Sequence, residues 1–301
     1  MGSQTNERDQ SEEIYNRVNS ALEAFLTDHV VAPLRNPSLV GIHMIKKFSK
    51  SWGNHKIMTK WVQQLFCHLD RGYVFNSQGA AATLVACSMC KFLDIGFGHT
   101  FERVRDGVLD LIEEERNGRE IDREEVRSCI EVFVVMGLCQ SRLCKNVKSV
   151  QEMLKMKQDL SIYEGHFETQ FIESTATYYR TQSALWKQES VPEYLIKCER
   201  ALTEEQERVS HYLERTTEAK LLGCVEVELL SGPQVEIVQR PNSGMYSLLM
   251  EAMIEKPLTE MPLGEREESK SAHLARMYQL FKRKGVVLQE QPMAEVFEQF
   301  V

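Results

Sequence analysis

The stretch that decides the fold class lies at residues 55–74 and reads HKIMTKWVQQLFCHLDRGYV. Its apolar residues recur at intervals of three and four, the spacing that lines one face of an α-helix. They occupy more than one side of the expected helix: Ile57, Met58, Trp61, Val62, Leu65, Phe66 and Leu69. Two interpretations stay open. The segment is a central core helix, or its far side meets a partner, because aromatic residues and arginine are enriched at interface cores.

The same helical spacing continues outward in both directions. Gly53-Asn54 predicts the end of the helix before this stretch, and no proline occurs between Pro37 and Pro192. Val225 to Leu230 alternates with glutamate but continues a helical register. Helices are therefore expected at 11–30, 39–52, 55–74, 79–97, 101–116, from 122, 150–156, 167–186, 190–213, 216–230, 243–255, 270–283 and 291–300. The fold class predicted is all-α.

Composition narrows the function classes. The 301 residues carry 36 Lys+Arg against 44 Asp+Glu, a net charge of -8, which argues against a nucleic-acid partner. No run approaches the roughly 18 apolar residues of a membrane span, so no membrane contact is expected. Residues 1–13 are polar and lack the apolar core of a secretory signal. Together with eight cysteines read as reduced thiols, this predicts a protein of the cytoplasm and nucleus.

Motifs for catalysis or metal binding are weak. Cys87 and Cys90 form a CxxC pair, but a zinc site commonly needs a second pair, so we interpret them as small core residues. Gly96-Phe97-Gly98-His99 lacks the third glycine of a dinucleotide loop. The acidic run at 113–115 is typical of a solvated helix face. We predict no catalytic residue, cofactor or metal, and hence no enzyme. The alternative left open is a cysteine-dependent enzyme whose site is not local in sequence.

Six stretches, in order along the chain, carry a family resemblance. They are Trp52-Gly-Asn-His-Lys-Ile-Met58 with Trp61 and Leu69-Asp-Arg71; Leu111-Ile-Glu-Glu-Glu-Arg-Asn-Gly118 with Ile121; Tyr163-Glu-x-x-Phe-Glu168; Pro192-Glu-Tyr-Leu195; Glu205-x-Glu-Arg-Val-x-His-Tyr-Leu213; and Leu274-Ala-Arg-Met-Tyr-Gln-Leu280. Together they resemble the N-terminal region of the cullin family, closest to the cullin-1 type and its plant forms. The resemblance covers about residues 11–300.

The resemblance implies an elongated stalk of tandem five-helix cullin repeats, the first repeat incomplete at its N-terminus. We expect a flexible N-terminus at 1–10, a partial repeat 1 and the start of repeat 2 at 11–118, repeat 2 running into repeat 3 at 119–230, and a divergent end of repeat 3 at 231–301. Segment 139–162 is longer than its counterpart in plant cullins, and 231–272 matches poorly. No role is assigned to either segment.

The resemblance also implies a function in the Ubl conjugation pathway, as a scaffold of an SCF-type E3 ubiquitin ligase. Repeat 1 would bind a Skp1-like adaptor with its F-box protein, through Val62, Leu65, His68, Leu69, Arg71 and Tyr73. In the family, helices two and five of repeat 1 form the adaptor surface. Residues 55–74 correspond to helix five, and helix two has no counterpart here, so weakened binding is expected. Nothing matches the RING-binding and neddylation region, so no RING partner is expected and a partial or decoy scaffold is predicted. A degenerate copy without function is the further alternative.

Overall fold

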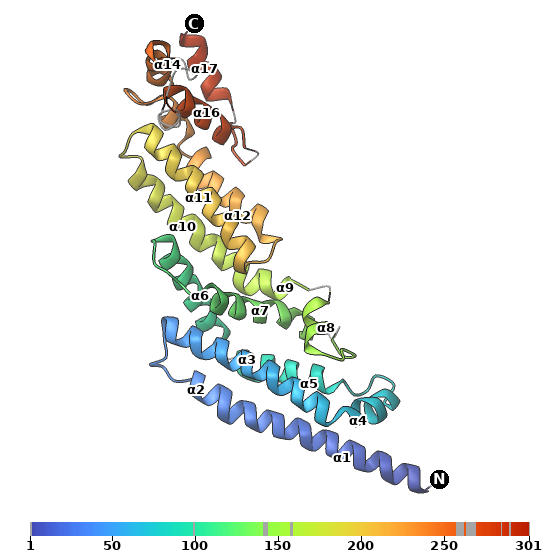
Figure 1. Cartoon of the computed structure of the whole chain (residues 1–301). Coiled ribbons are helices and arrows are strands. Elements are labelled where there is room, and N and C mark those ends of the chain that lie inside the picture. The colour runs from blue at the N-terminus through green and yellow to red at the C-terminus, as the bar shows by residue number, and fades with distance from the viewer. Residues whose placement is uncertain are drawn as a thin grey trace. The chain divides into compact units, whose positions relative to one another are not determined.

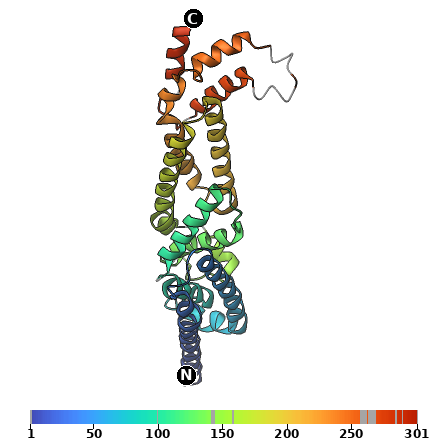
Figure 2. The ribbon, with the colours of Figure 1, turned by 90° about the vertical axis from the view of Figure 1, so that its left-hand side faces the viewer.

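The computed structural model describes residues 2–98, 100–140, 144–156, 159–256, 262, 269–283, 285–288 and 290–300. Within these ranges the chain is helical and contains no strand, which confirms the all-α prediction. It divides into two compact units, Met1–Gln170 and Phe171–Val301. Figure 1 colours the chain from one terminus to the other, and Figure 2 gives a second view. The predicted repeat boundaries at 118 and 230 stay predictions.

The first unit is built around one long helix. Helix α3 packs against α5, α6 and α7, and α1 lies along α5. The elements, including short π-helical segments labelled η, are α1 (Gly2–Phe25), η1 (Leu26–Val31), α2 (Ala32–Leu34), α3 (Gly41–Leu65), α4 (Cys67–Leu69), η2 (Asp70–Val74), α5 (Leu84–Lys91), η3 (Phe92–Phe97), α6 (Phe101–Arg116), α7 (Arg123–Gln140), α8 (Val150–Lys155), α9 (Ser161–Tyr163) and η4 (Glu164–Glu168).

The N-terminal half of α3 supplies the core of this unit. Phe48 and Trp52 are fully buried, and their rings lie 6.1 and 5.0 Å from that of Phe92. The indole Nε1 of Trp52 donates a 2.7 Å hydrogen bond to Glu131 Oε1 on α7. A buried indole needs such a partner, because an unpaired N–H in an apolar interior is costly.

The predicted helix end at Gly53-Asn54 is wrong. Helix α3 runs through both residues to Leu65. Trp52 and His55, on either side, are buried, and both rings pack against Phe92. Because these long-range contacts fix the backbone, the local preference of Gly-Asn for a helix end is overridden. The helix expected at 55–74 is correspondingly divided after Leu65, where Phe66 leaves helical geometry with φ -109° and ψ 23°.

Other helix boundaries differ less. Helix α1 begins at Gly2, within the stretch expected to be flexible, rather than at Ser11. Helix α6 has the predicted bounds, and the Asp122 side chain caps α7 by accepting hydrogen bonds from the backbone N–H groups of Glu124 and Glu125. In the described ranges no helix is both long and apolar enough to cross a bilayer.

The second unit, from Phe171 onward, continues α10 (Thr169–Trp186) and packs α11 against α12 and α16. Ser190 and Glu193 form the capping box that opens α11, with Pro192 in the first turn. Its other elements are α11 (Val191–Tyr212), α12 (Thr217–Glu226), η5 (Val227–Ser231), α13 (Gln234–Val238), α14 (Met245–Ile254), α16 (Lys270–Phe281) and α17 (Gln291–Phe300).

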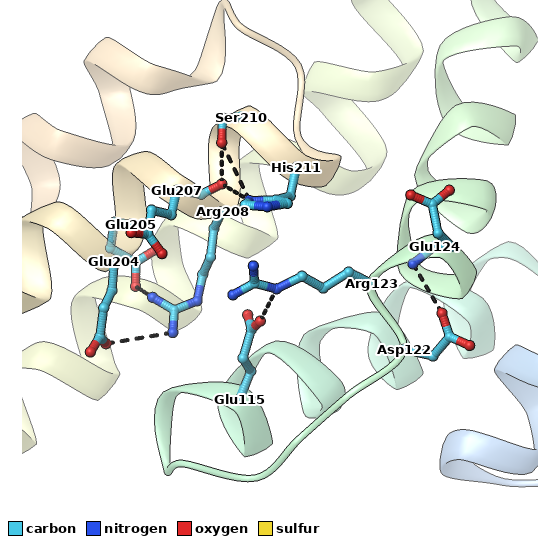
Figure 3. A network of polar contacts seen from close by, with 10 residues as sticks. All are labelled: Glu115, Asp122, Arg123, Glu124, Glu204, Glu205, Glu207, Arg208, Ser210 and His211. Carbon is cyan, nitrogen blue, oxygen red and sulfur yellow. Dashed lines mark hydrogen bonds and ion pairs between the residues drawn. The ribbon is translucent and has the colours of Figure 1, made fainter.

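A buried ion pair lies within the family-like stretch from Glu205 to Leu213. Glu205 and Arg208 on α11 are 0% and 3% exposed as side chains, and Arg208 Nη1 lies 3.0 Å from Glu205 Oε1. The same carboxylate oxygen accepts a 2.7 Å hydrogen bond from the Tyr179 hydroxyl. Figure 3 shows this pair, and it separately shows Arg123 of the first unit with Glu115, 2.6 Å apart. Each pair lies within one unit: Glu205 and Arg208 are both on α11, and Glu115 and Arg123 join α6 to α7.

Candidate partner-binding face

The C-terminal half of α3 carries an apolar stripe that nothing in the described chain covers. Ile57, Trp61 and Leu65 are 60%, 59% and 69% exposed. Residues four apart on a helix are neighbours on its surface, so the three side chains line one face. We call Ile57, Trp61 and Leu65 the exposed α3 face. Contiguous exposed apolar side chains on a globular surface mark interaction sites.

The opposite side of the same half-helix is held in place. Thr59 is buried and its hydroxyl lies 2.7 Å from Ser88 Oγ on α5. Val62 and Phe66 pack against a buried cluster made of Tyr15, Leu69, Val74 and Leu84. The exposed α3 face is therefore presented on a fixed element. A partner would not have to order this helix, which lowers the entropic cost of binding.

Segment η2, which follows α4 in the chain, is anchored to α5. Asp70 Oδ1 accepts a 3.0 Å hydrogen bond from the backbone N–H of Leu84, at the start of α5. Burial raises the pKa of the Asp70 carboxyl, and the hydrogen bond from Leu84 opposes the rise. The turn that carries Arg71 and Tyr73 is thereby tied to α5.

The six residues predicted to bind an adaptor fall into three groups. Leu65, His68 and Arg71 are exposed, whereas Val62 and Tyr73 are half-buried and pack against the Tyr15 cluster. Leu69 is 0% exposed, so its side chain is a core group and its assignment to the surface is corrected. The reason is that the chain turns at Phe66, which rotates Leu69 inward against Tyr15 and Leu84.

Three exposed residues are absent from the predicted set. Ile57, Trp61 and Phe75 are 60%, 59% and 81% exposed. Ile57 could have been found from its four-residue spacing to Trp61 and Leu65. Phe75 carried no such signal, because it follows the break in the helix at Phe66.

The thiols do not follow the CxxC pattern. Cys87 Sγ lies 2.9 Å from the Tyr15 hydroxyl, while Cys90 Sγ lies 3.6 Å from Cys144 Sγ. The two cysteines of the motif thus belong to different environments. Both are partly buried rather than fully buried. Their interpretation as small core residues is therefore only partly right.

A nucleophilic thiol is activated by an adjacent base or by a lowered pKa. Burial raises the pKa of Cys129 and of Cys198. The hydrogen bonds that Cys144 shares with Cys139 and Cys90 lower the pKa of its thiol. The group around Cys144, as far as the described residues show it, consists of thiols and holds no histidine.

The comparisons with known proteins agree on one family. Residues 3–301 match the cullin family, in the region described as the cullin alpha solenoid domain. The chain is 30% identical over 294 residues to putative cullin-like protein 1 and 31% identical over 294 residues to Cullin-2, both of Arabidopsis thaliana. It is 28% identical over 302 residues to Cullin-1 of Oryza sativa subsp. japonica. These matches cover 97%, 97% and 100% of this chain but 35%, 34% and 35% of the relatives.

Proposed function

Because the chain belongs to the cullin family, we propose that it is a scaffold of an SCF-type ubiquitin ligase that binds a Skp1-like adaptor with its F-box protein. The single observation that supports this choice is the exposed α3 face. It lies on the segment for which the family resemblance implies adaptor binding, and it has the uncovered apolar character of an interface.

The side chains suit a protein partner. Trp61 and Leu65 are the apolar anchors, and an exposed tryptophan is among the side chains most often found to dominate binding energy. His68 and Arg71 are exposed on the short segments that follow and form the polar rim. Such rims exclude water from the anchors while contributing little energy themselves.

Titration of the full chain with a purified Skp1–F-box complex tests the proposal. Wild type should bind, and the double variant Trp61→Ala/Leu65→Ala should lose at least about 30-fold in affinity, the size of an interface hot spot. The matched control is Leu185→Ala, which removes a leucine that is 53% exposed on α10. Equal affinity of all three proteins would overturn the assignment of the α3 face.

The decoy prediction is tested in the same assay by adding a RING protein. A scaffold that holds the adaptor but recruits no RING protein fits it, whereas firm RING binding contradicts it. A melt of the circular dichroism signal tests the degenerate-copy alternative. A cooperative transition is expected, because both units have buried apolar cores.

Native thiol labelling tests the enzyme alternative. In an enzyme with a cysteine nucleophile, one thiol would react fast with the label, and labelling it would abolish a measurable activity. Labelling that has no activity to abolish supports the scaffold.

A further inference from the structure

Three cysteines from separate stretches of the first unit converge on one point. Cys90 lies on α5, Cys139 lies near the end of α7, and Cys144 follows in the next described segment. Their sulfur atoms all lie within 4.8 Å of one another. We call Cys90, Cys139 and Cys144 the thiol cluster.

The spacing of the sulfurs is that of metal ligands. Cys144 Sγ lies 3.6 Å from Cys90 Sγ and 3.8 Å from Cys139 Sγ. Metal–thiolate bonds of about 2.3 Å place two ligating sulfurs about 3.7–4.0 Å apart in tetrahedral or trigonal geometry. The cluster therefore surrounds a volume of the right size for one ion, and small movements are enough to bring the three sulfurs to bonding distance.

Hydrogen bonds hold the backbone around the thiol cluster in place. The N–H of Thr83, the residue that caps α5, donates to Lys145 O at 2.9 Å, and its hydroxyl donates to Val147 O at 2.6 Å. The N–H of Val147 donates to Cys144 O at 3.0 Å. The segment that carries Cys144 is thus tied to the start of the helix that carries Cys90.

The degree of burial also suits a binding site. Cys144 is buried, while Cys90 and Cys139 are partly exposed. An ion can therefore reach the cluster from solvent and then be held by one sulfur inside the protein. Both Cys139 and Cys144 belong to segment 139–162, to which the sequence assigned no role.

From this geometry we propose that Cys90, Cys139 and Cys144 bind one thiophilic d10 cation, Zn²⁺ or Cu⁺, as three thiolate ligands. Soft thiolates select these ions over the hard cations that carboxylates and carbonyls bind. With Cu⁺ three sulfurs complete a trigonal site. With Zn²⁺ a water or another exogenous donor takes the fourth position, since zinc is four-coordinate. Binding ties α5, the end of α7 and the following segment together.

The test uses the reduced full chain with Zn²⁺ alone and, in a second arm under anaerobic conditions, with Cu⁺ alone. We expect one equivalent of one of these ions to bind, measured by competition with a chromophoric chelator. Replacing Zn²⁺ by Co²⁺ should give thiolate-to-cobalt charge-transfer absorption. The arm with the tighter binding identifies the ion.

Variants assign the ligands. Cys90→Ser, Cys139→Ser and Cys144→Ser should each lower affinity by more than the about 10–100-fold that loss of an outer-shell group costs. The matched control is Cys87→Ser, one turn away on the same helix, which should bind as wild type does. Equal loss in Cys87→Ser and Cys90→Ser would overturn the proposal in favour of the CxxC pair.

A readout on the unmodified chain keeps the proposal falsifiable if a variant does not fold. Bound ion should protect the three cluster thiols, but not Cys87, from alkylation mapped by mass spectrometry. It should also raise the melting temperature with increasing ion concentration, because it binds the folded state. Reduced protein that takes up neither ion would refute the proposal, and a disulfide within the cluster on oxidation would then identify it as a redox pair.

Discussion

The two halves of α3 share one helix and one apolar period but differ in what covers them. Phe48 and Trp52 in the first half are fully buried, whereas Trp61 and Leu65 in the second half are more than half exposed. An apolar stripe therefore specifies a contact but not the partner. The first half finds its partner within the chain, in α5, α6 and α7. In the second half the same kind of surface is exposed at Trp61 and Leu65.

The largest expected effect separates the halves by stability. Trp52→Ala should lower the free energy of unfolding by about 3–5 kcal/mol, because it leaves a cavity against Phe92 and removes the indole hydrogen bond to Glu131. Trp61→Ala should change it by no more than about 0.5 kcal/mol, because the ring is exposed. Denaturant titration measures both. Similar losses in the two variants would show that the second half is also a core element.

A pH titration sharpens the contrast at His55, next to the boundary between the halves. Burial lowers the pKa of His55 from 6.5 to about 4, and the hydrogen bond to Ser88 O opposes the shift. The unfolded chain therefore binds the proton first. The stability that the neutral ring contributes is complete above pH 6.5 and is lost as the pH falls toward 4, by up to about 3 kcal/mol.

The comparison with His55→Gln isolates this contribution from that of the carboxyl groups. The variant should have a shallower fall in unfolding free energy between pH 6.5 and 4 than wild type. Trp61→Ala should keep the wild-type slope. Parallel curves for wild type and His55→Gln would refute the assignment.

Affinity should show the reverse pattern. Trp61→Ala alone should cost about 2 kcal/mol of binding to the Skp1–F-box complex, the threshold of a hot spot, while stability is kept. Lys60→Ala, beside it in sequence and exposed, is the matched control and should have little effect. A larger loss from Lys60→Ala than from Trp61→Ala would indicate a charge-led contact instead.

The smallest expected effect lies at Gly53, where the halves join. A Cβ at this position meets no atom within 4 Å, and the residue lies inside α3. Gly53→Ala should therefore stabilise the protein by about 0.5–1 kcal/mol through helix propensity. A shift of the denaturation midpoint at constant slope checks this. Destabilisation would mean that the helix is broken here, as the sequence pattern had predicted.

The sequence predicted those helix ends that are set by residues close by in the chain. The helix expected at 101–116 matches α6, because its end is set by the turn at Asn117-Gly118, where Gly118 has φ 83°. The helix expected at 190–213 matches α11 closely, because Ser190 caps its start and Pro192 lies in its first turn. Both are set within a few residues of the chain.

Contacts between distant residues were not predictable in the same way. Leu65 and Leu69 have the same character in the stripe, and only Tyr15 and Leu84 decide that Leu69 is the buried one. The thiol cluster joins residues up to 54 positions apart, a combination that the local CxxC pattern of Cys87 and Cys90 does not contain. The sequence alone could not say which side chains of residues 55–74 reach the surface.

Hydrogen exchange of the full chain, with and without a Skp1–F-box complex, tests the central claim most directly. The account predicts slower amide exchange across residues 57–75 on addition of the complex, with no change across 44–52, where α3 is already packed inside the unit. Unchanged exchange across 57–75, with or without protection elsewhere, would contradict the claim that the exposed α3 face binds the adaptor.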